Sequence, residues 1–96
     1  MRYQVRLTDD AKDDLGYLRV FEQKIILEGI RSSLGDEPLT ESRNRKPLRE
    51  NPLAPWELRL GKYRVFYRVE EEDVIIGAVG VKEHNRLFIR GEEHQL

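Results

Sequence analysis

The chain has 96 residues, of which 39% are hydrophobic and 36% are charged, and its 17 basic and 18 acidic side chains give a net charge of −1. This length fits a single domain, residues 1–96, with one modest core, and the near-neutral charge argues against a general nucleic-acid binder. The sequence contains no cysteine, which excludes disulfides and thiol chemistry.

The N-terminal segment predicts a short strand. Polar and apolar residues alternate over residues 2–7, so one face of this strand is expected to be buried. Neither this segment nor any later one has the apolar run of a signal peptide or a membrane span. We therefore expect a cytoplasmic protein that makes no membrane contact.

Two helices, packed as an antiparallel hairpin on a sheet, are predicted next. Thr8 is the expected N-cap of the first helix, because two aspartates follow it in the first turn, where the helix dipole favours acids. The second helix is expected over residues 21–34, with Gly35 as its C′ residue. The join between the helices contains neither Gly nor Pro, so one bent helix is an alternative. The predicted apolar stripe of the second helix consists of Phe21, Ile25, Ile26, Leu27, Ile30 and Leu34.

Residues 36–55 are expected to form a long loop, because all four prolines lie in this segment. Loops of this length are uncommon in small domains and often functional. Basic residues are concentrated here and just beyond: residues 43–68 hold eight basic and two acidic side chains, a net +6 that leaves −7 for the rest of the chain. Such a segment has a positive local field although the whole chain is not basic.

Residues 56–69 have the pattern of a tight β-hairpin. Apolar and polar residues alternate on both sides of Gly61-Lys62, which suits a two-residue type II′ loop. That loop places Arg59 directly opposite Arg64. Two arginines in this position repel each other, so the polar face of the hairpin is expected to bind an anion. The alternative is a salt-bridged, solvated face on which Glu57 or another acid neutralises the arginines.

Further strands are predicted after an acidic turn at residues 70–73. Residues 74–81 form a near-continuous apolar run, typical of a central strand that is covered on both faces. This strand is expected to pair with residues 63–69, and its glycines, Gly77 and Gly80, to allow bulges or close packing. Residues 86–89 are expected to add a short strand, and residues 91–96 to form a tail.

The sequence lacks the usual catalytic constellations: it has no thiol, no glycine-rich phosphate loop and no histidine pair at metal-ligand spacing. No metal or cofactor is therefore expected. What remains is a cationic set, in which Arg59, Arg64 and Arg68 share the polar face of the hairpin. Four later residues are expected to leave the sheet near the same face: Lys82, His84, Arg86 and Phe88.

These residue types suit a phosphate-containing polymer. Arginine binds two phosphate oxygens with its planar fork, and Phe66 or Phe88 offers a ring for base stacking. His84 is a candidate for moving a proton, because histidine is the residue type that titrates near neutrality. The alternative for His84 is an ordinary surface histidine.

At these residues the chain resembles the RelE/ParE superfamily of type II toxins. The most specific match is the run Leu58-Arg-Leu-Gly-Lys-Tyr-Arg-Val-Phe-Tyr67. Other matching segments follow the same order over most of the chain: Leu7 to Leu15, the helix ending at Leu34, Pro38, Lys46 to Arg49, Trp56 and Glu57, and Val79 to Phe88.

The resemblance implies an α+β fold, in which two N-terminal helices pack on a mostly antiparallel twisted sheet of about four strands. It also implies a cognate antitoxin that wraps the toxin and covers its active face, so a toxin–antitoxin hetero-oligomer is expected. In the RelE branch the toxin cleaves mRNA in the ribosomal A site. In the ParE branch it inhibits DNA gyrase.

Within the RelE branch, the resemblance assigns catalytic positions to three residues. Arg64 matches an arginine that contacts the scissile phosphate, Arg59 matches a lysine on the preceding strand, and Lys82 matches an arginine proposed to act on the leaving group. His84 is added as the acid–base candidate. The residues expected to bind RNA phosphates or bases are Arg45, Lys46, Arg49, Arg68 and Phe88.

Two positions depart from the RelE pattern. Phe88 stands where the catalytic tyrosine lies and has no hydroxyl, and Glu57 stands where a second basic residue is found and adds repulsion beside a phosphate. Despite these departures, the resemblance to the RelE branch implies a type II toxin that is a metal-independent, ribosome-dependent mRNA endoribonuclease. The alternative is a gyrase inhibitor or a catalytically silent homologue that acts only through protein contacts.

Overall fold

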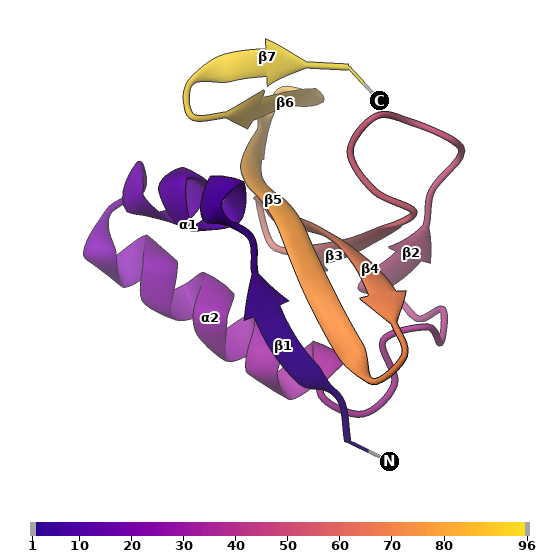
Figure 1. Cartoon of the computed structure of the whole chain (residues 1–96). Coiled ribbons are helices and arrows are strands. Elements are labelled where there is room, and N and C mark those ends of the chain that lie inside the picture. The colour runs from indigo at the N-terminus through magenta and orange to yellow at the C-terminus, as the bar shows by residue number, and fades with distance from the viewer. Residues whose placement is uncertain (1, 96) are drawn as a thin grey trace.

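The computed structural model describes residues 2–95, so Met1 and Leu96, the two ends of the predicted domain and tail, lie outside the described residues. Within this range the chain forms two helices and seven strands (Figure 1). The elements in chain order are β1 (Gln4–Leu7), α1 (Asp9–Gly16), α2 (Val20–Leu34), β2 (Arg45–Pro47), β3 (Trp56–Leu60), β4 (Tyr63–Glu70), β5 (Asp73–Glu83), β6 (Arg86–Ile89) and β7 (Glu92–His94).

All the described strands belong to one sheet with the order β2-β3-β4-β5-β6-β7, in which every neighbouring pair is antiparallel. The exception is β1, which pairs with β5 in parallel. The 11-residue β5 accommodates β1 along its first half and β6 at its far end, while β4 occupies its other edge. The α+β class and the mostly antiparallel sheet are confirmed, whereas the expected count of about four strands was too low within residues 2–95.

The helices begin where local chemistry predicts. The hydroxyl of Thr8 accepts a hydrogen bond from the backbone N–H of Ala11 at 3.1 Å, as expected of an N-cap. The chain then breaks between the helices, and the backbone N–H of Arg19 donates to the Glu22 carboxylate at 3.2 Å. Two separate helices therefore replace the alternative of one bent helix. Gly35 follows the last residue of α2 as its C-cap, with φ −74°, so the prediction that it is the C′ residue was wrong.

The helices lie on one face of the sheet and bury the main core there (Figure 1). On α2 only Ile26, Ile30 and Leu34 are buried. The wider predicted stripe was wrong, because the side chains of Phe21, Ile25 and Leu27 are 58%, 47% and 38% exposed.

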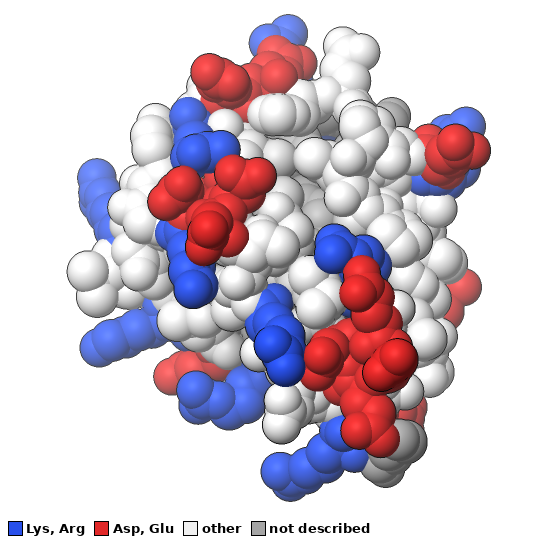
Figure 2. All heavy atoms as spheres, in the orientation of Figure 1, with Lys and Arg blue, Asp and Glu red and all other residues white. Residues whose placement is uncertain are grey.

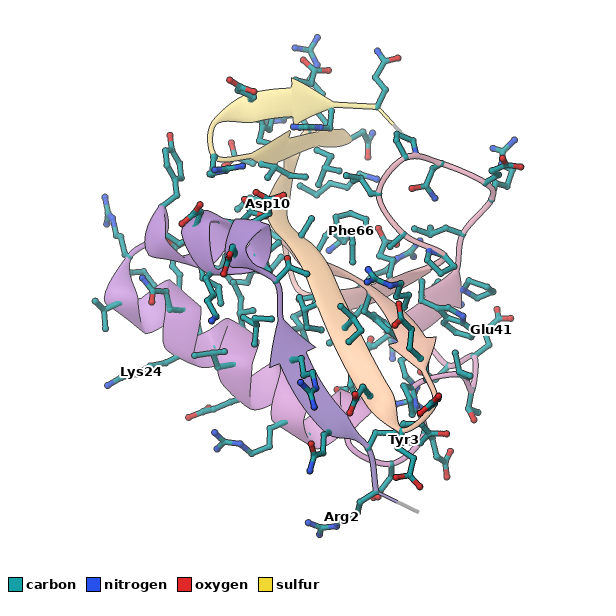
Figure 3. The ribbon with its side chains drawn as sticks, in the orientation of Figure 1. Arg2, Tyr3, Asp10, Lys24, Glu41 and Phe66 are labelled. Atoms are coloured by element: carbon teal, nitrogen blue, oxygen red, sulfur yellow. The ribbon has the colours of Figure 1, made fainter. Side chains whose placement is uncertain are left out.

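A second, smaller core lies on the opposite face of the sheet. Phe66 is fully buried there together with Ala78 and two residues of β6, under a lid of Leu48, Leu53 and Ala54 from the loop before β3 (Figure 3). Phe66 therefore has no free ring for base stacking, and that prediction was wrong. The residues that the lid covers on β6 are Leu87 and Ile89.

The predicted loop at residues 36–55 is held against the sheet. It contains the three-residue strand β2, which pairs with β3 and which the sequence did not predict. The buried hydroxyl of Tyr67 donates to the carbonyl of Pro38 at 2.5 Å, and burial raises the pKa of this tyrosine. No helix within residues 2–95 is long and apolar enough to span a membrane.

Candidate functional site

The β3–β4 hairpin has the predicted register. Arg59 stands opposite Arg64, and Leu60 stands opposite Tyr63. Gly61 has φ +60° and no positive φ is found at the next residue, as a type II′ turn requires. The turn chemistry and the alternation together fix which side chains share a face, so the opposed arginines are confirmed.

The carboxylate of Glu57 lies on the same face as this arginine pair. Its side chain is 5% exposed, with Oε2 at 2.9 Å from Nε of Arg59 and Oε1 at 3.8 Å from Nε of Arg64. The carboxylate of Glu57 is therefore the anion that pairs with Arg59, so the chain itself supplies it. This geometry corresponds to the salt-bridged alternative that the sequence left open.

Arg64 is held close to the hairpin turn. Its Nη1 donates to the carbonyls of Gly61 at 2.6 Å and Tyr63 at 2.9 Å, and its side chain is 15% exposed. Burial lowers the pKa of Arg64, the Glu57 carboxylate opposes this shift, and the charge of Arg59 adds to it. The Nε–H of Arg64 is buried without a hydrogen-bond acceptor among the described residues. The Nε–H of Arg64 is thus a donor that a bound ligand could satisfy.

Lys82 joins the arginines on this face. Gly80 pairs with Arg64 across β4 and β5, and Lys82 follows two residues later on the same side of β5. The backbone N–H of Lys82 donates to the carbonyl of Lys62 at 2.7 Å, so the hydrogen bonding along β5 extends to the turn of the β3–β4 hairpin. We call Arg59, Arg64 and Lys82 the cationic face.

Phe88 does not lie on the cationic face, and the expectation that it does was wrong. Phe88 stands opposite Val81, whose side chain packs against the main core on the helix side of the sheet. Lys82 stands opposite Leu87, which belongs to the smaller core on the other side, under the loop. Residues directly opposite in an antiparallel pair point to the same face. The ring of Phe88 therefore points to the helix side, where it lines a cleft.

His84 lies at the exposed tip of the β5–β6 hairpin. It has φ +51° and its neighbour Asn85 has φ +66°, the two left-handed residues of a type I′ turn. This turn is four residues beyond Gly80, the partner of Arg64, which is roughly 13 Å along an extended strand. An RNA segment would have to span this separation to contact both residues.

The other predicted RNA-binding residues are spread over several elements. Arg45 stands opposite Leu58, and its guanidinium donates to the carbonyls of Thr40 and Ser33 at 2.9 and 3.0 Å. The Arg45 side chain therefore points to the helix side, where it holds the loop at residues 36–55 in place. This role was not predicted for Arg45.

Lys46, Arg49 and Arg68 are placed differently from Arg45. Lys46 stands opposite Glu57 and has its Nζ at 3.7 Å from Glu41, and Arg68 pairs with Glu70 at 2.5 Å. Arg49 is exposed in the loop and has no recorded ion pair within residues 2–95. On the face seen in Figure 2, basic groups alternate with acidic ones, and no broad basic surface is visible there.

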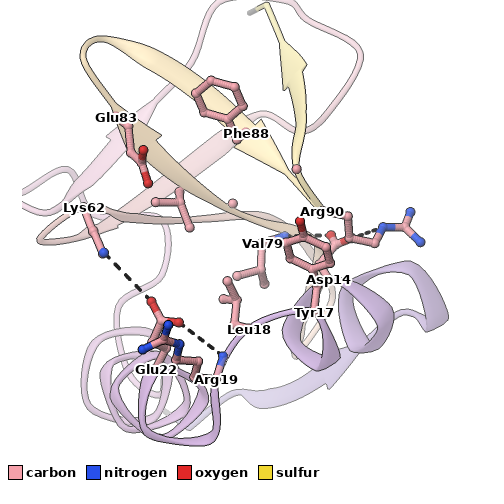
Figure 4. A pocket seen from close by; sticks show the side chains of 13 residues that line it. Asp14, Tyr17, Leu18, Arg19, Glu22, Lys62, Val79, Glu83, Phe88 and Arg90 are labelled. Carbon is pink, nitrogen blue, oxygen red and sulfur yellow. Dashed lines mark hydrogen bonds and ion pairs between the residues drawn. The ribbon is translucent and has the colours of Figure 1, made fainter.

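The cleft on the helix side contains polar contacts that the sequence did not predict (Figure 4). It has a volume of about 390 Å³. The Tyr63 hydroxyl donates to Glu22 at 2.8 Å, and Nζ of Lys62 lies 3.9 Å from the same carboxylate. Burial and this hydrogen bond raise the pKa of Tyr63 to about 12, and the hydrogen bond lowers the pKa of Glu22.

A buried carboxylate lies at the other end of this cleft. Asp14 is 2% exposed, accepts a hydrogen bond from the backbone N–H of Val79 at 3.0 Å and lies 2.9 Å from Nε of Arg90. Burial raises its pKa, while the Val79 and Arg90 contacts oppose that shift. Asp14 comes three residues after Ala11 on the buried stripe of α1, so the helical spacing contained a signal for its burial. Within residues 2–95 no cluster of three His, Asp or Glu side chains is arranged to hold a metal ion.

The fold and this hairpin match a known family of toxins. Residues 5–88 match the family described as the ParE toxin of type II toxin–antitoxin systems, parDE. The chain belongs to this family and is thus a type II toxin of the RelE/ParE superfamily.

Relatives of known sequence and structure agree. The chain is 31% identical over 90 residues to Toxin RelG of Mycobacterium tuberculosis strain H37Rv, covering 94% of this chain and all of that protein. It is similar to a chain of the toxin–antitoxin complex RelBE2 of M. tuberculosis, with a TM-score of 0.73, 32% identity, and coverage of 85% of this chain and 100% of the other. It is also similar to a chain of the archaeal RelE–RelB complex from Pyrococcus horikoshii OT3, with a TM-score of 0.61, 26% identity, and coverage of 79% and 90%.

Proposed function

We propose that this toxin inhibits translation in the cytoplasm by cutting ribosome-bound mRNA, and that a cognate antitoxin neutralises it in a hetero-oligomer. The observation that carries the proposal is the cationic face, on which one turn and one strand pairing bring Arg59, Arg64 and Lys82 together. Cations arranged in advance of the reaction stabilise the charge that develops on a phosphorane. Relatives in known toxin–antitoxin complexes support the antitoxin partner.

The proposed reaction is an internal transfer at one RNA phosphate. The 2′-oxygen loses its proton and forms a bond to phosphorus, the bond from phosphorus to the 5′-oxygen breaks, and that oxygen takes up a proton. A 2′,3′-cyclic phosphate and a 5′-hydroxyl result. Arg64 and Arg59 neutralise the equatorial oxygens, and Lys82 faces the leaving oxygen.

Proton transfer requires a further group, since Phe88 has no hydroxyl and points away from the cationic face. We assign this role to His84, because imidazole can both accept and donate a proton. Because a general base acts only within hydrogen-bond reach, the reacting ribose must lie between the two hairpin tips, where the side chains of Arg64 and His84 can both reach it. The other residues of the proposed RNA surface are Arg49, Lys46 and Arg68.

The antitoxin is proposed to cover the outward side of the helices. Large apolar side chains are exposed there, with Val20 at 68% and Tyr17 at 62%. Basic residues Arg19, Lys24 and Arg31 are interleaved with them, which suits an acidic amphipathic segment. The test is co-purification with the product of the adjacent gene, in which Phe21→Glu should weaken the complex and Glu28→Gln, an exposed change on the same helix, should not.

Induced expression in a bacterial host, followed by primer extension on mRNA, tests the proposed reaction. The proposal expects new 5′ ends inside translated codons. Intact mRNA together with DNA damage would favour the second candidate, a toxin that acts on gyrase or another protein through contacts alone. Two observations favour that candidate: Glu57 already neutralises Arg59, and Phe88 brings no hydroxyl.

A further inference from the structure

Glu57 occupies an unusual place for an acidic residue. Glu57 is 4% exposed, yet both of its carboxylate oxygens point toward guanidinium groups of the cationic face. Lys46 stands opposite it on the other neighbouring strand. A buried carboxylate is costly unless cations compensate for its lost hydration, and here the compensation comes from the residues that an RNA phosphate would use.

The two arginines share this carboxylate unequally. Arg59 makes a hydrogen bond to Oε2 at 2.9 Å, whereas Nε of Arg64 lies 3.8 Å from Oε1 and has no acceptor within residues 2–95. A single carboxylate thus satisfies one donor of the pair and leaves the other buried and unmatched. A phosphate group has more acceptor oxygens, so it can serve both donors at once.

We propose that Glu57 is an internal stand-in for phosphate, which holds Arg59 in the free toxin and thereby sets the affinity of the cationic face for RNA. This inference rests on the proposed action on RNA. In the free toxin the carboxylate competes with RNA for Arg59 and repels the incoming phosphate. On binding, Arg59 exchanges the carboxylate for a phosphate oxygen, and the Nε–H of Arg64 gains an acceptor. Glu57 is thus a specificity-determining residue and takes no part in bond breaking.

The test compares Glu57→Gln with Glu50→Gln. Glutamine keeps the shape of Glu57 and an acceptor for Arg59 but removes the charge, while Glu50 is an exposed acid of the neighbouring loop. The probe is a short, labelled 2′-O-methyl oligoribonucleotide, which cannot be cut by attack of a 2′-hydroxyl. E57Q should bind it about tenfold more tightly than the wild type, the gain of roughly one charge-assisted hydrogen bond, and E50Q should not.

Salt dependence separates a change in the charge of the site from a structural effect. Without the Glu57 charge the cationic face carries one more net positive charge, so the slope of log K against log salt should steepen by about 0.7 in E57Q. Arg59→Gln should reduce binding more in the E57Q background than in the wild type, because only there does Arg59 bind phosphate without first giving up a charged internal partner. Equal losses in the two backgrounds, or weaker binding by a folded E57Q, would overturn the proposal.

A measurement on the wild type covers the case in which E57Q does not fold. The NMR signal of the Arg59 Nε–H should shift when the probe is added, since its acceptor changes from carboxylate to phosphate. Arg6, whose Nε pairs with Asp73 on the β1 side of the sheet, is the control. RNA binding without any shift of the Arg59 signal would contradict the exchange and leave the proposed function intact. Absence of binding in every variant would also overturn the proposal, because Glu57 would then not set the affinity of the cationic face for RNA; the proposed function is tested separately by the mapping of mRNA ends.

Discussion

The carboxylate of Glu57 lies 2.9 Å from Nε of Arg59, on the face of the hairpin where Arg59 stands opposite Arg64. The Glu57 carboxylate therefore offsets the repulsion between the two arginines without a bound ligand. Because the carboxylate is almost fully buried, this ion pair is screened less by solvent than a surface pair. It explains how an ordered hairpin tolerates two opposed cations in the free protein.

Arg64→Ala should relieve toxicity when the toxin is expressed without its antitoxin. If Arg64 contacts the reacting phosphate, loss of one such donor slows cleavage by about a hundredfold or more. Arg64→Lys keeps the charge but not the planar fork, so it should retain only part of the activity. The measurement is growth after induction, with circular dichroism to establish folding, and Arg31→Ala on the helix side as the control. A folded Arg64→Ala variant that remains as toxic as the wild type would remove Arg64 from the site.

The Tyr63–Glu22 contact should make stability depend on pH in the alkaline range. The pKa of Tyr63 is raised in the folded state to about 12 from an ordinary value of 10.0, so the folded state holds this proton more tightly than the unfolded state. The contribution is complete below pH 10 and is lost as the pH rises from about 10 to about 12. Thermal unfolding of the wild type and Tyr63→Phe across this range should show the steeper fall in the wild type, and parallel curves would count against the contact.

Asp14 should have two separable roles, as an acceptor and as a buried charge. Asp14→Ala leaves the Val79 N–H without an acceptor and should cost about 1–3 kcal/mol in the free energy of unfolding. Asp14→Asn keeps an acceptor and should cost less.

The charge of Asp14 should be visible in the acid range. Its folded-state pKa is raised by burial, so the stability of the wild type should fall relative to Asp14→Asn as the pH rises from the ordinary value through the raised one. Denaturant unfolding of both proteins over a pH series measures this difference. The opposite slope would show that Arg90 outweighs burial.

Two glycines should respond to alanine in opposite directions. A Cβ at Gly80 would lie 2.8 Å from the backbone oxygen of Phe88, so Gly80→Ala should destabilise the β5–β6 pairing by about 1–3 kcal/mol. Gly16, the last residue of α1, has nothing within 4 Å of such a Cβ, and Gly16→Ala should stabilise the protein by roughly 0.5 kcal/mol. Chemical denaturation of both variants tests the pair, and a stable Gly80→Ala protein would contradict the close approach of β6.

The hairpin could be predicted from sequence because its determinants are local. The two residues Gly61 and Lys62 set the turn, and a two-residue turn sets the register of every pair that follows. The N-cap at Thr8 is local in the same way. Both features follow from residues within a few positions of one another.

One failure of prediction comes from a contact between distant segments. Phe66 alternates with the apolar residues of β4 and so was placed on a polar face, but the loop at residues 48–54 covers it. The error at Phe88 has a local cause: the turn at His84-Asn85 sets the register of β6 against β5, but it contains no glycine that would have marked it in the sequence. The three-residue strands β2 and β7 are too short for periodicity to reveal.

A reconstituted translation reaction measures whether this toxin cuts ribosome-bound mRNA and whether Arg64 is required. Purified toxin is added to defined mRNA with and without ribosomes, and the RNA ends are mapped for the wild type and for Arg64→Ala. We expect cuts that require ribosomes, end in a 2′,3′-cyclic phosphate and disappear in the folded Arg64→Ala variant. Intact mRNA in the presence of ribosomes and active wild-type toxin, or cuts that persist without Arg64, would contradict it.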